Sequence, residues 1–370
     1  MDNRDVRIGP NRVTNHNHKK ELKIKNKRGD TFFEIISLEN LFYSWAEFKR
    51  GKENKKDVQE FALNLEDNIF ELHNDLKNNL YQHSKYTSFF ISDPKLRCIN
   101  KAKVRDRLLH QAIFKIIEPI FEKIFIFDSY SSRKNKGTHR AIKRFQKMAW
   151  KLSKNNTRTV WVLKCDIKKF FDSIDHNILL RLIKLKVTNR KTVELIEKVI
   201  YSFRENEETG IPLGNLTSQL FSNIYLNELD QFIKRGLKIK NYIRYADDFV
   251  ILSDERDNLE KVFLKIDEFL KSELNLRFHP EKVIMEKWNS GVDFLGYVSF
   301  PYYTILRTKT KNRMLKKIAI KINCWRSKEI DTKSFSQTLQ SYMGVLKWCC
   351  WRKILKDVKE IVKQNKLLTI

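Results

Sequence analysis

The chain has 370 residues, of which 73 are Lys or Arg and 45 are Asp or Glu, so its formal net charge is +28. Hydrophobic residues make up 41% and aromatic residues 12%, which excludes a disordered chain and allows a substantial core. With only 10 Gly and 6 Pro, the composition also excludes collagen-like, linker and proline-rich classes. The surplus of positive charge predicts a polyanionic partner.

The cysteines and the hydropathy pattern indicate where the protein works. The five cysteines form neither a paired framework nor a CxxC zinc pattern, so we interpret them as buried, reduced thiols. No apolar run reaches the roughly 18 residues of a membrane span, and the N-terminus is charged where a signal peptide would be apolar. We therefore expect a cytoplasmic protein that does not act at a membrane.

The predicted elements begin with a flexible basic arm at residues 1–30, which has no periodic apolar face. From Leu38 to Tyr81, apolar residues at helical spacing predict amphipathic helices. Residues 85–102 alternate as strands do, with a turn signal at Asp93-Pro94. Val104–Phe125 returns to a helical period, which we expect to end near Pro119. The N-terminal third is thus predicted to contain amphipathic helices and then a β-ribbon followed by helices.

The centre of the chain carries two apolar strand segments that meet acids. Thr159–Cys165 runs directly into Asp166, and Tyr242–Ser253 is a strand pair interrupted by Asp247 and Asp248. Further elements are predicted as helices at 176–203 and 258–274 and as a short strand at 292–300. The order strand, helix, hairpin, helix, strand predicts an α+β domain with an antiparallel split βαβ sheet.

The last seventy residues are predicted to be helical and hold much of the surplus charge. Residues 301–370 contain 17 Lys or Arg and 4 Asp or Glu, a net charge of +13. Such localised charge suits an element that grips nucleic acid. The tryptophans at 325, 348 and 351 are expected to lie in the core of these helices.

Asp247 and Asp248 are adjacent carboxylates flanked by strand-forming residues. Buried together they would repel each other unless a cation neutralised them, whereas on an exposed hairpin tip they would be ordinary turn residues. Asp166 shifts the balance toward a cation, because a split βαβ topology can place its strand end beside the hairpin. Three carboxylates around two Mg²⁺ ions, with Mn²⁺ as a substitute, are what nucleotidyl transfer needs.

Five short motifs follow one another in the order of a known family. They are Asp166–Phe171, Gly210–Gln219, Tyr245–Asp248, His279–Lys282 and Phe294–Tyr297. Together they resemble the bacterial reverse transcriptases over Leu38–Val358, most nearly those of diversity-generating retroelements. The resemblance implies a right-hand polymerase fold with an antiparallel palm sheet. Its parts are the arm at 1–30, N-terminal helices and fingers at 31–158, a palm at 159–300 with a fingers-proximal segment at about 176–215, and a helical thumb at 301–370.

The resemblance also implies which residues carry the chemistry. Asp166, Asp247 and Asp248 match the metal-binding triad, with the carbonyl of Ile167 as a further metal ligand. Lys282 matches a lysine that protonates the leaving pyrophosphate as a general acid. Considered alone, a lysine is more often an ordinary surface residue.

Binding residues follow from the same motifs. The resemblance assigns the incoming dNTP to Lys95, Arg97, Phe171, Leu213, Gly214 and Tyr245. The first two would clamp its triphosphate, and Phe171 would exclude a 2′-hydroxyl, although it could equally be one core phenylalanine among 25. The primer and template would contact Phe294, Leu295, Gly296, Lys311 and Arg313.

Leu213 departs from the Pro-Gln-Gly sequence of many reverse transcriptases, because leucine cannot make the hydrogen bond of that glutamine to the nucleotide. This resembles the adenine-mutagenic enzymes of diversity-generating retroelements, so we expect error-prone copying of a structured RNA template. The implied partners are dNTPs, an RNA/DNA duplex and a small basic accessory protein. No HNH-like cluster or RNase H constellation is apparent, so those activities are not expected.

Three other interpretations remain open at this point. The first is an antiphage defence enzyme that copies a partner noncoding RNA or polymerises without a template. The second is an intron maturase, which the lack of a recognisable maturase segment disfavours. The third is a basic RNA-binding protein with a degenerate polymerase fold, although that interpretation predicts the loss of at least one of the three acids.

Overall fold

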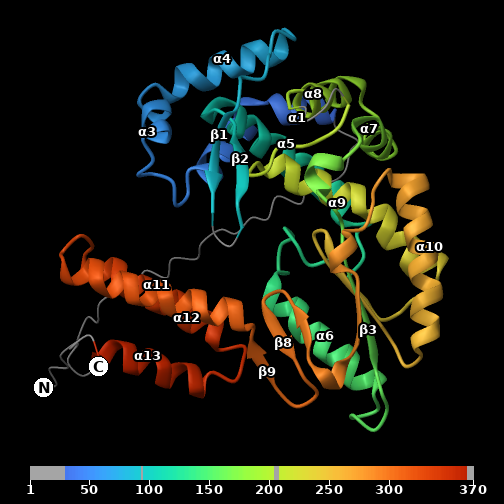
Figure 1. Cartoon of the computed structure of the whole chain (residues 1–370). Coiled ribbons are helices and arrows are strands. Elements are labelled where there is room, and N and C mark those ends of the chain that lie inside the picture. Colours follow the sequence, from blue (N-terminus) through green and yellow to red (C-terminus); the bar gives the residue numbers. More distant parts are fainter. Residues whose placement is uncertain (1–29, 93–94, 204–207, 365–370) are drawn as a thin grey trace, which may run out of the picture.

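The computed structural model describes residues 30–92, 95–203 and 208–364. Except for Asp30, the arm predicted at residues 1–30 lies outside these ranges. Asp30 caps the first helix, because its side chain accepts a hydrogen bond from the backbone N–H of Phe32. In Figure 1 the N-terminal lobe lies at the top, the central sheet at the lower right and the C-terminal helices at the lower left.

The N-terminal lobe has helices before and after a hairpin, in the chain order that the sequence predicts, and the hairpin projects from these helices (Figure 1). The elements are α1 (Thr31–Ile36), α2 (Leu38–Phe48), α3 (Lys56–Leu63), α4 (Leu65–Lys77), β1 (Thr87–Ile91), β2 (Arg97–Lys101) and α5 (Val104–Glu122). Helix α5 contacts α1, α2 and α3 and carries fully buried residues such as Ile113 and Ile117. The predicted end near Pro119 is wrong, since α5 continues to Glu122. Burial of Phe121 beyond the proline outweighs the lost backbone hydrogen bond.

The central sheet has four antiparallel strands in the order β4-β5-β3-β6. They are β3 (Trp161–Asp166), β4 (Tyr242–Tyr245), β5 (Asp248–Ser253) and β6 (Ile284–Lys287). Alternate residues face two separate cores: Leu163 and Cys165 belong to one, and Val162 to the other. Helix α10 (Arg256–Leu274) packs on the first face and α6 (Thr138–Leu152) on the second.

Three further helices lie between β3 and β4 along the chain. They are α7 (His176–Lys184), α8 (Arg190–Tyr201) and α9 (Leu216–Gln231). The first two lie within the range predicted to be helical, 176–203, and α9 joins the two lobes by packing on both α5 and α10. Helix α6 falls in the range predicted as fingers, yet it packs against β4 and β5 of the palm sheet. The predicted domain boundaries stay a proposal.

The strand predicted at 292–300 is wrong as a member of the central sheet. Strand β6 takes that place, and 292–300 folds into a hairpin of β7 (Val292–Phe294) and β8 (Tyr297–Ser299), joined by β9 (Thr304–Leu306) in a separate sheet. Leu295 and Gly296 both have positive φ, +53° and +87°, so they form a tight two-residue turn.

The C-terminal helices α11 (Thr308–Arg326), α12 (Thr332–Leu346) and α13 (Arg352–Gln364) pack around a small core to which α6, β8 and β9 also contribute residues. Two tryptophans predicted to be buried are not, because the short connection between α12 and α13 lies at the surface: Trp348 is 42% exposed and Trp351 is 38% exposed. The cysteines are free, as predicted, but only Cys165 is buried. No helix in the described part of the chain is long and apolar enough to cross a membrane.

Candidate active site

The three predicted carboxylates meet where the hairpin of β4 and β5 touches the end of β3. Asp166 and Asp248 are directly opposite each other on neighbouring strands, so their side chains share a sheet face. Tyr245 pairs with Asp248 across the hairpin and leaves Ala246 and Asp247 as its two-residue turn. The N–H of Ile167 donates to the carbonyl of Asp247 at 3.3 Å, which fixes this turn beside β3.

Burial and mutual repulsion make the ionised carboxylates costly. Burial raises the pKa of Asp248 to about 7, with Asp166 and Asp247 adding repulsion and Lys164 opposing them. Burial and the neighbouring Asp166 also raise the pKa of Asp247, against the opposing charges of Lys282 and Arg97. Within the described residues, the buried Oδ1 of Asp248 has no hydrogen-bond partner.

These carboxylates fit a hard divalent cation by their chemistry. All are oxygen donors, and their repulsion and the orphaned Oδ1 of Asp248 are what a Mg²⁺ ion would relieve. They do not form a complete metal site by themselves, since no group of three His, Cys, Asp or Glu side chains in the described ranges is placed to hold a metal ion. Asp248 also faces Lys164. The metal-ligand assignments, the Ile167 carbonyl included, therefore stay proposals.

Lys282 lies directly on the carboxylates. Its Nζ is 2.6 Å from Oδ1 of Asp166, and the two side chains are 34% and 19% exposed. The short helix Pro280–Lys282 presents it, and the N–H of His279 donates to the carbonyl of Asp166 at 2.8 Å. The structure thus brings the predicted general acid to the predicted metal site.

Arg97 and Lys95 come from the hairpin above the carboxylates. Arg97 is near enough to Asp247 to oppose the rise of its pKa, which places the start of β2 over the site. Lys95 is exposed next to residues 93–94, which lie outside the described ranges. The structure assigns Lys95 no contact with the site.

Phe171 follows Asp166 by five residues, and Tyr245 precedes the carboxylate turn. Phe171 is half-buried, its ring contacts that of Phe170, and its carbonyl accepts a hydrogen bond from the N–H of Ile211 at 2.9 Å. The hydroxyl of Tyr245 accepts a hydrogen bond from Thr138 at 3.2 Å. Both side chains are partly exposed, and their roles toward the nucleotide stay proposals.

Leu213 and Gly214 are fastened to the hairpin strand β2. The N–H of Asn100 donates to the carbonyl of Leu213 at 3.1 Å, and Nδ2 of Asn215 donates to the carbonyl of Asn100 at 2.8 Å. Gly214 has φ +105°, and a Cβ there would lie 2.8 Å from Cγ2 of Ile99. Sequence reasoning missed the roles of Asn100 and Asn215, because only the fold brings these segments together.

Arg244 is a second residue that sequence reasoning missed. It is fully buried on β4, and its Nη1 donates to the carbonyl of Ala246 in the carboxylate turn at 3.2 Å. Ala246 has φ +54°, a conformation that costs energy for a residue other than glycine. The sequence signal was an arginine within an otherwise apolar strand, because a buried arginine needs an acidic or other hydrogen-bonding partner.

Lys164 connects the hairpin of β7 and β8 to the carboxylates, because it lies near Asp248 and also bonds to Asp293 of β7. Nζ of Lys164 donates to the carbonyl of Asp293 at 2.7 Å, and Asp293 forms an ion pair with Arg307. The N–H of Arg307 donates to the carbonyl of Gly296 at 3.0 Å, so the predicted primer turn, with buried Phe294 and half-buried Leu295, is tied to the start of α11.

Two predicted thumb residues lie on α11. Lys311 pairs with Asp357 at 3.6 Å, and Arg313 is exposed. Their roles toward primer and template stay proposals.

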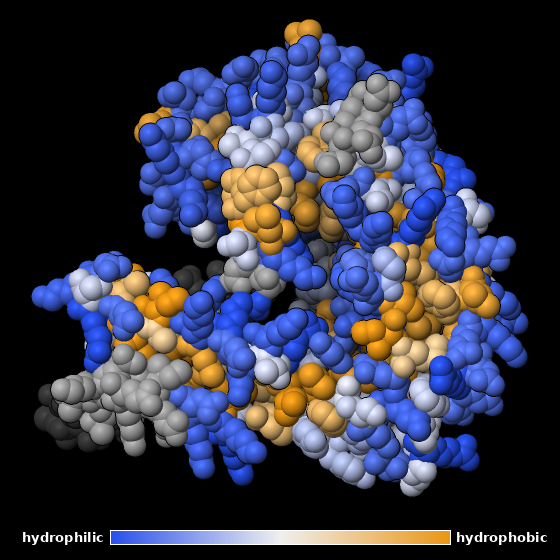
Figure 2. All heavy atoms as spheres, viewed as in Figure 1, coloured by the Kyte–Doolittle hydropathy of each residue, from blue (hydrophilic) through white to orange (hydrophobic). Residues whose placement is uncertain are grey.

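An apolar patch on the hairpin of β1 and β2 was not predicted. Phe90 is 69% exposed and Leu96 is 71% exposed, and Phe89 and Ile91 are also exposed. Figure 2 shows apolar atoms gathered over this hairpin, above the hollow that separates the N-terminal lobe from the C-terminal helices. The alternation predicted for residues 85–102 does not hold at Phe89, Phe90 and Ile91, which are consecutive apolar residues, and this run was the available sequence signal for the patch.

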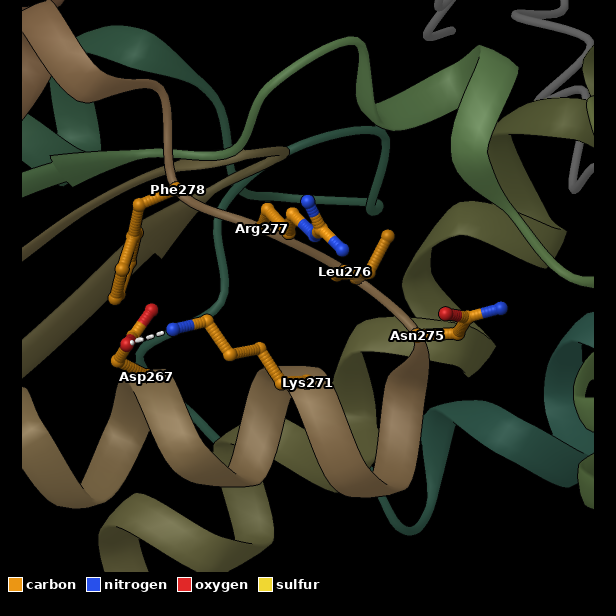
Figure 3. A pocket seen from close by; sticks show the side chains of 6 residues that line it. All are labelled: Asp267, Lys271, Asn275, Leu276, Arg277 and Phe278. Atoms are coloured by element: carbon orange, nitrogen blue, oxygen red, sulfur yellow. Dashed lines mark hydrogen bonds and ion pairs between the residues drawn. The ribbon is translucent and has the colours of Figure 1, made fainter.

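A pocket of about 510 Å³ lies at the C-terminal end of α10 (Figure 3). Its lining includes Lys271, which pairs with Asp267, and the backbone of Arg277 and Phe278 borders the end of β3. Helix α10 covers the sheet face opposite the one that Asp166 and Asp248 share. This pocket therefore does not belong to the carboxylate site.

Similar proteins come from both sequence and structure. YkfC of Escherichia coli is 29% identical over 245 residues, covering 56% of this chain and 64% of YkfC. The group II intron-encoded protein LtrA of Lactococcus lactis is 24% identical over 342 residues, covering 73% of this chain and 55% of LtrA. The chain thus spans less than two thirds of either relative. A telomerase from Candida albicans, solved with a fragment of telomeric RNA, superposes with a TM-score of 0.49 at 11% identity, covering 77% of this chain and 58% of that one.

A family match covers more than half of the chain and includes Asp166, Asp247 and Asp248. Residues 87–299 match the family described as reverse transcriptase (RNA-dependent DNA polymerase). The mixed helices and sheets, with the carboxylates on the central antiparallel sheet, agree with the right-hand polymerase fold. The chain therefore belongs to the reverse transcriptase family.

Proposed function

We propose that this protein is an RNA-directed DNA polymerase that makes cDNA by nucleotidyl transfer. The observation that carries the proposal is the pairing of Asp166 with Asp248 beside the Asp247 turn, in a buried setting that favours a divalent cation. Two Mg²⁺ ions held by Asp166, Asp247, Asp248 and the Ile167 carbonyl would activate the 3′-hydroxyl and stabilise the leaving pyrophosphate.

The chain's own residues would do the rest by position and charge. Arg97 carries its guanidinium toward the carboxylates and would bind the triphosphate, with Lys95 beside it on the same hairpin. Phe171 would exclude a ribose 2′-hydroxyl by its bulk. Lys282, now paired with Asp166, would hold the proton that leaves with pyrophosphate.

A primer extension assay tests this proposal. Purified protein is given dNTPs, Mg²⁺ and a primed RNA template, and wild type is compared with Asp247→Ala. Asp254→Ala is the matched control, because Asp254 is an exposed acid just beyond β5. We expect extension to be abolished by the first change and kept by the second. Equal activity of all three proteins would disprove the proposed active site.

For the biological role we favour error-prone copying of a structured RNA in a diversity-generating retroelement. Leu213 supports this proposal, since its aliphatic side chain offers no hydrogen bond to a nucleotide while its backbone is held to β2. The partners would be the RNA/DNA duplex and a small basic accessory protein, in the cytoplasm. Sequencing of extension products tests it: we expect errors concentrated at template adenines and fewer of them in Leu213→Gln. Ordinary accuracy at adenine would refute it.

The named relatives favour a second role, in copying or binding a group II intron RNA, because LtrA matches 73% of the chain. An antiphage role with a partner noncoding RNA is a third alternative, in which the enzyme would catalyse the same polymerase reaction. The surrounding DNA separates the three. A template and variable repeat pair that differs mainly at adenines would indicate the retroelement role. Intron boundaries around the coding sequence would indicate the group II intron role. If the DNA contains neither feature, the defence role is favoured.

A further inference from the structure

One stretch of the chain is free of acidic residues although it is rich in cations. Residues 129–165 contain no Asp or Glu and eleven Lys or Arg. The stretch includes the whole of α6 and leads into β3. The chain has 45 acidic residues in all, and none of them lies on α6.

The cations of α6 form a single row on its outer side. Ala141, Phe145 and Met148 are buried against the central sheet, which fixes the helix in place. On the opposite side, exposed cations follow at intervals of three or four residues, the spacing of helical neighbours. This α6 stripe consists of Arg140, Lys143, Lys147 and Lys151. At 1.5 Å per residue it is about 17 Å long.

Carboxylates do not neutralise the α6 stripe. Within the described residues no ion pair includes any of its four members, and Arg140 instead donates to the carbonyl of Asn135. Arg144, on the same helix, does pair with Asp128 and is not part of the stripe. Like charges at this spacing repel and destabilise a helix unless an anion binds them.

Helix α10 shows that such a row is not a general result of the chain's net charge. Its exposed Lys261 and Lys265 alternate with acids such as Glu260 and Glu268. Two ion pairs along it, Arg256 with Glu260 and Lys271 with Asp267, follow the usual i,i+4 pattern. Net positive charge alone therefore does not produce an acid-free surface helix, although α11 in the C-terminal part of the chain is a second helix without Asp or Glu.

We propose that the α6 stripe binds the phosphate backbone of a folded RNA, on a surface separate from the carboxylate site. The proposal rests on the proposed function in taking RNA as the polyanion. A membrane surface is disfavoured, because an interfacial helix needs a free apolar face and that of α6 is buried in the sheet. The lysines present no planar groups for base recognition, so binding follows charge and helix shape and not sequence.

The contact fits RNA outside the copied segment. The stripe points away from the sheet on which Asp166 and Asp248 lie, since α6 covers that sheet with its buried side. A rigid row on a packed helix can hold a folded RNA while another part of it is copied. The surface would thus retain the template RNA between rounds of synthesis.

The test compares two triple variants that remove the same charge. Lys143→Gln/Lys147→Gln/Lys151→Gln changes the α6 stripe, and Lys184→Gln/Lys261→Gln/Lys265→Gln changes exposed lysines on α7 and α10. Binding of bulk tRNA, the folded probe, is measured over a range of salt concentrations. We expect the stripe variant to bind more weakly, with a salt slope lower by about 2 to 3. The control triple keeps the wild-type slope.

Three further readouts make the outcome decisive. Equal loss in both triples would overturn the proposal, because binding would then report net charge alone. Loss of extension on a short primed RNA in the stripe variant would also overturn it, since the stripe would then belong to the polymerase site. Lys143→Arg/Lys147→Arg/Lys151→Arg must retain tRNA binding, which separates a charge effect from misfolding. Binding by the Asp247→Ala protein keeps this test independent of polymerisation.

Discussion

Arg244 and Asp230 form a fully buried, two-pronged ion pair beneath the carboxylate turn. Nε and Nη2 of Arg244 lie 2.8 and 2.6 Å from the two carboxylate oxygens of Asp230, and both side chains have no exposed surface. Tyr242 donates to the same carboxylate at 2.7 Å. Because Arg244 also bonds the Ala246 carbonyl, helix α9 is linked to the turn that carries Asp247.

Arg244→Met is therefore expected to lower stability and activity together. The change leaves Asp230 buried without its counter-ion, which costs about 3–5 kcal/mol in the free energy of unfolding. Urea unfolding measures the loss, and primer extension measures the effect on the turn.

The double variant Arg244→Met/Asp230→Leu separates the two roles of Arg244. Removing both charges should restore much of the stability, since no ion is then left uncompensated. Activity should stay low, because the Ala246 carbonyl still lacks its donor. Full recovery of extension by the double variant would show that Arg244 has no part in positioning the turn.

Lys282→Gln is expected to slow the chemical step. If Lys282 donates the proton to pyrophosphate, kcat should fall on the order of 10²- to 10⁴-fold with little change in KM for dNTP. Lys282→Arg should be nearly as slow, since arginine keeps the charge and does not release its proton. Lys287→Gln, an exposed lysine on β6, is the control. A fast arginine variant would indicate that only the charge beside Asp166 matters.

Gly214→Ala is expected to destabilise the contact between β2 and the 213–215 segment. Its positive φ of +105° and the approach of Ile99 together predict a loss of roughly 1–3 kcal/mol. Gly344→Ala on α12 is a matched control, because a Cβ there meets no atom within 4 Å and should be neutral or stabilising. Thermal unfolding of both variants checks the pair, and an unchanged Gly214→Ala protein would contradict the described backbone.

His110 predicts how stability depends on pH. Complete burial lowers its pKa from 6.5 to about 3, and the nearby His83 and Arg107 add to the effect. The unfolded chain therefore binds a proton that the folded chain excludes, so stability falls as pH drops from 6.5 toward 3. The slope is about 1.4 kcal/mol per pH unit.

Urea unfolding at several pH values, compared between wild type and His110→Gln, isolates this residue from the carboxylates that titrate in both proteins. The variant should show a shallower loss of stability in acid. Nε2 of His110 lies 3.2 Å from Nε2 of His83, and the variant loses this contact. It is therefore also expected to be less stable near neutral pH. Parallel curves for the two proteins would refute the assignment.

The local elements could be predicted where their signals lie within a few residues. Tyr242–Ser253 encodes both strands of the catalytic hairpin and its turn, and the predicted helix at 258–274 matches α10 within two residues. The motif order was sufficient to indicate the family, because each motif is a short run of neighbouring residues. The identity of Asp166, Asp247 and Asp248 as candidate site residues came from the sequence for the same reason.

Tertiary structure decided what depends on distant segments. The ion pair of Lys282 with Asp166 joins residues 116 positions apart, and Arg244 reaches Asp230 only because α9 packs under β4. Strand β6 forms the edge of the central sheet beside β3. Residues 292–300 do not, because the turn at Leu295-Gly296 folds that segment into a hairpin of its own. Exposure of Trp348 and the one-sided charge of α6 likewise depend on which faces pack. Hydrophobic pattern sets the local period, but pairing and burial are properties of the assembled chain.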